Sequence, residues 1–162
     1  MTKPVRVLFV CLGNICRSPT AEGVFRHVVT QAGLADRIHV DSCGTADFHV
    51  GEPPDRRSQA AARSRGIDLS ELRARQLSPE DLKRFDYVLV MDRQNLANVR
   101  ELWHQNGGAQ PELFLSYADQ GDADTDEVPD PYHGGEQGFE RVFDLVQAAS
   151  EGLLRHIRKH QL

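Results

Sequence analysis

The chain has 162 residues, of which 40% are hydrophobic and 27% charged, and its formal net charge is −5. These values predict a single globular domain over residues 1–162. The acidic balance argues against a nucleic-acid-binding protein, and no apolar run approaches the roughly 18 residues of a membrane helix. Three cysteines are too few for a secreted disulfide framework. With no signal-peptide pattern either, we expect a cytoplasmic protein, and secretion by a signal-less route stays open.

The negative charge is concentrated in residues 119–130. This segment holds six carboxylates and no Lys or Arg, so the rest of the chain carries a net charge of +1. An anion site elsewhere in the chain would therefore depend on local groups rather than on net charge.

Short apolar runs alternate with helical periods along the chain. The runs predict strands over residues 5–10, 38–42, 85–91 and 112–115. The periods predict helices over residues 19–32, 55–65, 93–106 and 139–157. This alternation indicates an α/β fold, in which helices cover both faces of a parallel sheet. Ligands bind such sheets beyond the carboxyl ends of the strands, so the loop after residue 10 is the first candidate site.

We predict a phosphate-binding loop there, formed by Cys11, Leu12, Gly13, Asn14, Ile15, Cys16, Arg17 and Ser18. Gly13 and Asn14 readily adopt left-handed conformations, which lets the loop turn its amides inward. The following helix begins with Ser18 as the expected N-cap and Pro19 in its first turn, and it adds the positive end of its dipole. Arg17 would hold a phosphate through two hydrogen bonds.

Cys11 would lie at the bottom of this loop. Donors that bind phosphate also stabilise a thiolate, so we expect Cys11 to ionise readily and to attack phosphorus, with Ser18 hydrogen-bonded to the sulfur. One alternative to this interpretation is structural, and another is a metal site. Cys11 and Cys16 could be small buried hydrophobic residues. A metal site is not expected, because Cys-x4-Cys supplies two ligands and no second pair has suitable spacing.

The stretch from Cys11 to Pro19, so close to the N-terminus, resembles the signature of the low molecular weight protein tyrosine phosphatases. The resemblance extends over nearly the whole chain and includes Ala74-Arg75-Gln76, Phe85-Asp86-Tyr87, Met91-Asp92 and Asp130-Pro131-Tyr132. It implies a three-layer α/β/α fold with a central four-stranded parallel sheet. It also implies two-step hydrolysis of phosphotyrosine without metal or cofactor.

The resemblance assigns a role to each residue of the loop that matches the family. Cys11 matches the nucleophile that forms a cysteinyl-phosphate, and Arg17 matches the arginine that binds the phosphate and stabilises the transition state. Asn14 and Ser18 match the residues that hold the loop and the thiolate. Cys16 matches the second cysteine, which in similar proteins forms a reversible disulfide with the nucleophile.

Asp130 matches the general acid. Its chemistry supports the role, since a leaving phenolate needs a proton and the attacking water then needs a base. Asp-Pro is also a common turn pair, which is the alternative explanation. Tyr132 matches an aromatic residue of the substrate slot. Phe48 and His49 lie in the variable loop, where they would form an aromatic wall or simply pack the loop.

Two positions depart from the family pattern. His133 stands where many relatives have a second tyrosine. Leu72 stands where some relatives have a histidine that supports the phosphate loop, so we expect other contacts, such as Ser42, to stiffen the loop.

Three other functions are alternatives for a chain with such a loop. An arsenate reductase shares the loop but needs cysteines in the middle of the chain, and none follows Cys43. A domain that only traps phosphoproteins would be expected to lack Cys11, Arg17 or Asp130, and all three are present. A redox sensor using Cys11 and Cys16 would be a regulatory addition. The expected partner is a phosphotyrosine-containing protein, with a tyrosine kinase as one candidate, and the protein would be a monomer or weak homodimer.

Overall fold

Four parallel strands form the centre of the protein in a computed structural model, which describes residues 3–119, 125–131 and 135–162 apart from the side chain of Glu136. The strand order is β2-β1-β3-β4, with every neighbouring pair parallel. The strands are β1 (Val5–Cys11), β2 (Ile38–Gly44), β3 (Tyr87–Val90) and β4 (Pro111–Leu113). The α/β prediction with a four-stranded parallel sheet is confirmed.

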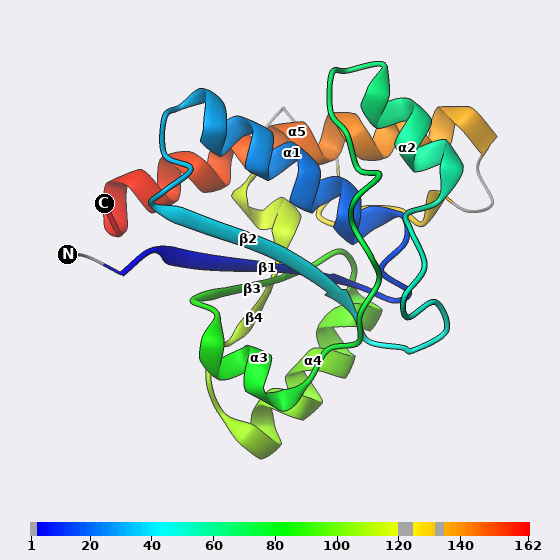
Figure 1. Cartoon of the computed structure of the whole chain (residues 1–162). Coiled ribbons are helices and arrows are strands. Elements are labelled where there is room, and N and C mark those ends of the chain that lie inside the picture. The colour runs from blue at the N-terminus through cyan, green and yellow to red at the C-terminus, as the bar shows by residue number, and fades with distance from the viewer. Residues whose placement is uncertain (1–2, 120–124, 132–134) are drawn as a thin grey trace.

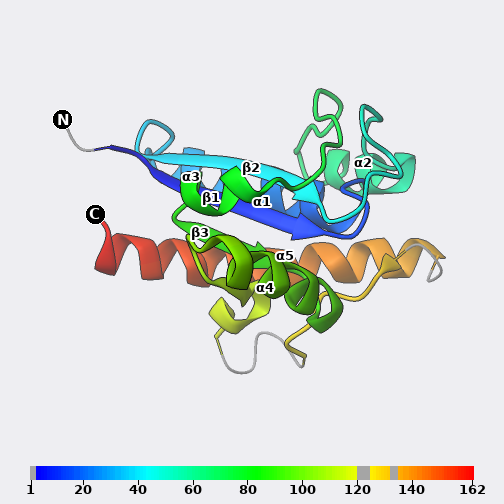
Figure 2. The same ribbon diagram turned by 90° about the horizontal axis from the view of Figure 1, so that it is seen from below.

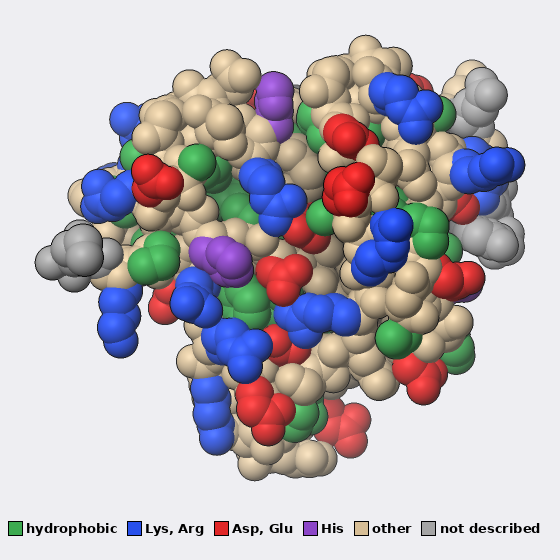
Figure 3. Space-filling model, in the orientation of Figure 1, with side chains coloured by type: hydrophobic (Ala, Val, Ile, Leu, Met, Phe, Trp, Pro, Cys, Tyr) green, Lys and Arg blue, Asp and Glu red, His purple; other side chains and the backbone are tan. Residues whose placement is uncertain are grey.

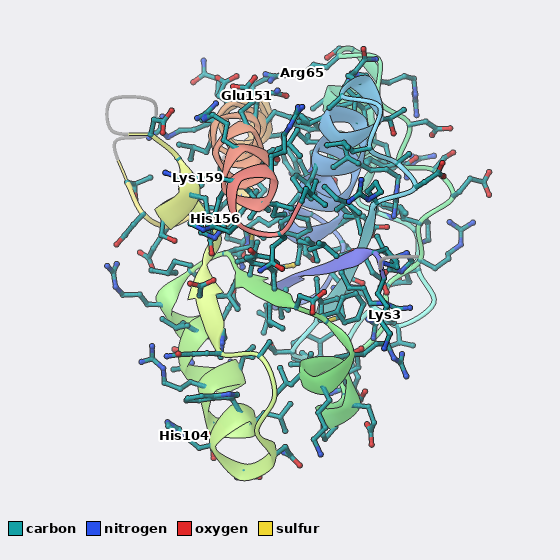
Figure 4. The ribbon with its side chains drawn as sticks, turned by 90° about the vertical axis from the view of Figure 1, so that its left-hand side faces the viewer. Lys3, Arg65, His104, Glu151, His156 and Lys159 are labelled. Atoms are coloured by element: carbon teal, nitrogen blue, oxygen red, sulfur yellow. The ribbon has the colours of Figure 1, made fainter. Side chains whose placement is uncertain are left out.

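Helices cover both faces of this sheet (Figures 1 and 2). On one face lie α1 (Arg17–Gln31), α2 (Arg56–Arg63), α5 (Gly135–His160) and the 3₁₀ turn η1 (Phe114–Tyr117). On the other face lie α3 (Pro79–Arg84) and α4 (Arg93–Asn106). Figure 4 shows the three layers, with Glu151, His156 and Lys159 on α5 on one side of the sheet and His104 on α4 on the other.

The central strand β1 is buried on both faces. Val7 and Phe9 pack into the core beneath α1 and α5, whereas Leu8 and Val10 pack into a second core beneath α3 and α4. All four side chains have no exposed surface. Alternate side chains of a strand point to opposite faces, so a continuous apolar run is what a doubly covered strand requires.

The register brings the carboxyl ends of the strands to one edge of the sheet. Cys11 is paired with Gly44, and Val10 with Val90. Position 44 requires glycine, because a Cβ there would lie 2.7 Å from the carbonyl oxygen of Leu12. The end of β2 therefore supports the loop that follows β1, at the right of Figure 1.

One local prediction was wrong, and one helix was missed. Helix α1 begins at Arg17, with Cys16 as an N-cap that makes no side-chain cap bond, so Ser18 is not the cap. The Ser18 hydroxyl instead bonds groups of the phosphate loop. Helix α3 was not predicted, because six residues are too few to show a helical period. Its start is nevertheless marked by Ser78, Pro79 and Asp81, which form a capping box with proline in the first turn.

Charged side chains of both signs intermingle on the surface (Figure 3). In the acidic segment, Asp126 and Glu127 pair with Arg93, and Asp119 pairs with Arg155. The described carboxylates of that segment are thus largely matched by arginines from two helices. No helix within the described residues has the length and apolar character needed to cross a membrane.

Candidate active site

The loop between β1 and α1 holds Cys11 at its base, with 3% of the residue exposed. Its sulfur is hydrogen-bonded to the Ser18 hydroxyl at 2.9 Å. The backbone N–H of Asn14 also points at the sulfur, at 3.3 Å. The Asn14 N–H and a hydroxyl that can donate therefore converge on one sulfur at the N-terminus of a helix, an arrangement suited to negative charge on the sulfur.

Asn14 fixes the shape of this loop. Its φ of 59° makes it the one non-glycine among the described residues in the left-handed region, which asparagine tolerates better than most residues. Its side-chain amide donates to Ser18 Oγ at 2.8 Å and to Ser42 Oγ at 3.0 Å. Its side-chain oxygen accepts from the backbone N–H of Arg75 at 3.0 Å. The expectation that Ser42 supports the loop, where Leu72 does not, is confirmed.

Ser42 is held in turn by Glu22, a residue that the sequence analysis did not single out. The Ser42 hydroxyl donates to Glu22 Oε1 at 2.6 Å. Arg26 donates to the other Glu22 oxygen at 2.5 Å and to the carbonyl of Val40 at 2.7 Å. Burial raises the pKa of Glu22, and the bonds from Ser42 and Arg26 oppose that rise. The sequence did carry one signal for Glu22, because it places a charged residue on the face of α1 that is buried.

Arg17 is almost fully buried and is fixed by Asp92. Its Nη1 donates to Asp92 Oδ2 at 2.6 Å and to the carbonyl of Val128 at 3.1 Å. Burial alone would lower the pKa of Arg17, but the charge at Cys11 and the bond from Asp92 outweigh it, so the pKa rises. Asp92 also caps α4 by accepting from the Asn95 N–H. Its second role at Arg17 was missed, although it follows β3 at the same edge.

A cavity of about 190 Å³ opens over the loop, and its lining brings together nine residues of the predicted site, Asp130 among them. The lining residues are Cys11, Leu12, Gly13, Ile15, Cys16, Arg17, Phe48, His49 and Asp130. Asn14 and Ser18 are not among them and lie buried behind the loop. Tyr132 falls outside the described residues, as does His133.

The variable loop supplies one side of this cavity. Phe48 is 72% exposed, which leaves its ring available to an occupant. His49 packs against Gly13, where an added Cβ would meet the His49 ring at 3.0 Å. His49 is itself paired with Glu52. The loop is thus anchored through His49 while Phe48 faces outward.

The other two cysteines differ from Cys11 in their surroundings. Burial, followed by the charge of Asp55, raises the pKa of Cys16 to about 12. Cys43 is fully buried, and burial raises its pKa well above the usual value. Both are therefore held as neutral thiols at pH 7, although Cys16 shares the cavity with Cys11.

The geometry places a thiol, a guanidinium and a carboxyl around one cavity at a helix N-terminus. A family model described as low molecular weight phosphotyrosine protein phosphatase matches residues 6–162. The chain belongs to this family. A low molecular weight phosphotyrosine protein phosphatase of Schizosaccharomyces pombe is 46% identical over 158 residues, which cover 97% of this chain and 99% of the relative. The recognition drawn from the loop is thereby confirmed.

Solved structures of the family have the same architecture. The crystal structure of YfkJ from Bacillus subtilis matches with a TM-score of 0.91 and 39% identity, covering 99% of both chains. A protein tyrosine phosphatase from Entamoeba histolytica matches with a TM-score of 0.89 and 35% identity, covering 98% of this chain and 99% of its own. This phosphatase is therefore an enzyme of the protein-tyrosine-phosphatase class with the α/β fold of the family.

Proposed function

We propose that this phosphatase hydrolyses phosphotyrosine and small aryl phosphates through a cysteinyl-phosphate on Cys11, with Asp130 as general acid and base and without a metal. The observation that carries the proposal is the convergence of Ser18 and the Asn14 N–H on the Cys11 sulfur. Arg17 and Asp130 line the same cavity.

In the first step the Cys11 thiolate attacks phosphorus, an S–P bond forms and the P–O bond to the aryl group breaks. Asp130 gives its proton to the leaving phenolate. Arg17, held by Asp92, presents its guanidinium to the equatorial oxygens, which carry the charge in the transition state. The bound phosphate dianion favours the protonated form of a carboxyl that faces it.

In the second step water attacks the cysteinyl-phosphate, Asp130 takes the proton from that water, and the S–P bond breaks. The Ser18 hydroxyl has one proton and two neighbours, Cys11 Sγ and the carbonyl of Cys43 at 3.3 Å. When the thiolate leaves phosphorus, that proton turns to the sulfur and stabilises it as a leaving group.

Cys16 has a different role in this proposal. Because burial holds it as a thiol, it does not compete as a nucleophile. Its place in the cavity beside Cys11 supports its use as the partner in a reversible disulfide that inactivates the enzyme under oxidation. The proposed substrates are phosphotyrosine proteins, with a tyrosine kinase among the candidates.

The test is hydrolysis of para-nitrophenyl phosphate in EDTA, with and without vanadate, by the wild type, Cys11→Ser and Cys43→Ala. We expect Cys11→Ser to lose about 10⁴-fold or more in kcat. Cys43→Ala removes a cysteine that does not line the cavity, and it should keep its activity. Turnover by Cys11→Ser at the wild-type rate would overturn the proposal. Loss of wild-type turnover in EDTA would overturn it as well.

A further inference from the structure

Beside the catalytic cavity lies a second, larger hollow of about 400 Å³. Its walls come from four separate parts of the chain: the phosphate loop, the segment after β2, the segment before α3, and α4. Leu12 lines both the hollow and the catalytic cavity, and it is 42% exposed. We call this hollow the side groove.

The side groove has an apolar floor. Leu12, Ala46, Leu77 and Leu102 contribute to its lining. Leu77 and Leu102 also pack against the core beneath α3 and α4, so the floor is fixed by the interior of the protein. The Ala46 N–H donates to the Leu12 carbonyl at 3.0 Å, which holds two of these walls together.

The remaining lining residues, Thr45, Gln76 and Asn98, are polar and neutral. Gln76 and Asn98 are exposed. The Gln76 amide nitrogen donates to the Thr45 carbonyl and the Asn98 oxygen accepts from Gln94, so the Gln76 oxygen and the Asn98 amide nitrogen are the groups that can pair with a peptide backbone. The Thr45 hydroxyl is buried with no hydrogen-bond partner among the described residues. This hydroxyl has almost no exposed surface, so the polar contacts open to an occupant come from Gln76 and Asn98.

Charge separates the side groove from the catalytic cavity. The cavity contains Arg17 and Asp130, whereas no Lys, Arg, Asp, Glu or His is found among the lining residues of the groove. The groove therefore offers no charged partner to an occupant, which favours an uncharged side chain. Because Leu12 is shared, a chain whose phosphate enters the cavity passes over Leu12 to reach the groove.

Resting on the proposed function, we infer that the side groove binds an apolar residue flanking the phosphotyrosine of a protein substrate. The phosphotyrosine enters the catalytic cavity, the neighbouring backbone contacts Gln76 and Asn98, and the apolar side chain rests on Leu77 and Leu102. The enzyme then prefers phosphopeptides with an apolar flank to those with a polar or acidic one.

The test uses phosphotyrosine peptides in one Gly/Ser frame, each with a single Leu, Ser or Asp at one of three positions on either side of the phosphotyrosine. At one position at least, Leu should raise kcat/KM about tenfold over Ser, as expected for one buried apolar side chain. Asp at that position should lower kcat/KM below the Ser value. Turnover of para-nitrophenyl phosphate by the same preparation reports separately on the proposed function.

Asn98→Asp introduces a carboxylate into the groove at an exposed position, so folding should be unaffected. It should remove most of the Leu preference, measured relative to para-nitrophenyl phosphate turnover by the same variant. Leu102→Ala removes an apolar side chain from the floor of the groove, and it should reduce the preference for Leu as well. Gln105→Glu is the matched control, because it adds a carboxylate to the same helix outside the groove, and it should keep the preference.

Equal kcat/KM for all peptides, or a Leu preference that survives Asn98→Asp and Leu102→Ala, would overturn the inference while leaving the proposed function intact. If the wild type turns over neither the phosphopeptides nor para-nitrophenyl phosphate, the result would instead contradict the proposed function.

Discussion

The two sides of the active site, which we name the nucleophile side and the acid side after the roles proposed for Cys11 and Asp130, are built differently. On the nucleophile side, Cys11, Asn14 and Ser18 are buried and joined by hydrogen bonds to Ser42 and Glu22, which lie further inside. On the acid side, Asp130 is exposed at the end of an acidic segment whose ion pairs lie on the surface.

The two sides meet at Val128. This residue is fully buried, its N–H donates to the carbonyl of Met91 at 2.7 Å, and its own carbonyl accepts from Arg17. The acid side is thus joined to the buried core at Val128, two residues before Asp130, and Glu127 adds a bond to the start of α4 by accepting from the backbone N–H of Arg93 at 2.8 Å. From this difference we expect substitutions on the nucleophile side to change stability and activity together. Substitutions on the acid side should change activity alone.

Asp130→Asn tests this difference most strongly. The amide cannot protonate the leaving group, so kcat for phenyl phosphate should fall about 10²- to 10³-fold. The loss for para-nitrophenyl phosphate should be smaller, because that leaving group needs less help from a proton. Since Asp130 is exposed, the free energy of unfolding in urea should match that of the wild type.

Asp126→Asn is the control for Asp130→Asn, because it removes a carboxylate of the same segment that faces Arg93 rather than the cavity. Its kcat should stay near the wild-type value with both substrates. An equal loss by Asp130→Asn across leaving groups would remove Asp130 from the acid role.

The difference between the two sides also explains what could be predicted from the sequence. The loop was predictable because its residues are adjacent in the chain and sit between a buried strand and a helix. Asp92 and Glu22 were missed as functional residues because their partners, Arg17 and Ser42, are 75 and 20 residues away. Such pairings depend on strand order and helix packing, which a single sequence does not specify.

Ser18 shows how a local rule fails at a functional site. A serine before a proline is a sound helix start by propensity, yet the hydroxyl is used by Cys11 and Asn14 instead. The helix start is left with Cys16, whose side chain makes no cap bond. In the acidic segment the sequence predicted crowded carboxylates, whereas distant arginines pair with those that the structure describes.

Asp81→Asn tests the nucleophile side at a distance from the chemistry. Arg75 donates to Asp81 and Asp41, and its backbone N–H holds Asn14. Asp81 is buried, so loss of its charge should lower the free energy of unfolding by about 2–3 kcal/mol at pH 7. Because Arg75 then positions Asn14 less firmly, kcat should fall as well, by about threefold, and this fall distinguishes the variant from those of the acid side.

The pH dependence of Asp81→Asn follows from the sign of the shift. Burial would raise the pKa of Asp81, but Arg75 and Ser78 outweigh burial and lower it below its usual 3.8. The stabilisation is therefore complete above about pH 5, declines as the pH falls below the usual 3.8, and is lost as the pH falls through the lowered pKa. Urea unfolding at pH 7 and pH 3 should show the gap between wild type and Asp81→Asn narrowing in acid. Asp68→Asn, an exposed carboxyl whose pKa is also lowered, is the control and should leave stability at pH 7 almost unchanged.

Arg93→Ala should have the smallest effect, and it tests whether the side-chain pairs of Arg93 position Asp130. The bond from the Arg93 backbone N–H to Glu127 remains in this variant. Arg93 pairs with Asp126 and Glu127, but more than half of its side chain is exposed, and exposed pairs contribute little. If Val128 is the anchor, kcat for phenyl phosphate should fall less than about threefold. Arg155→Ala removes a similarly exposed pair with Asp119 and provides the baseline. A tenfold loss of kcat confined to Arg93→Ala would show that the surface pairs, rather than Val128, hold Asp130 over the cavity, and that both sides of the active site depend on networks of comparable strength.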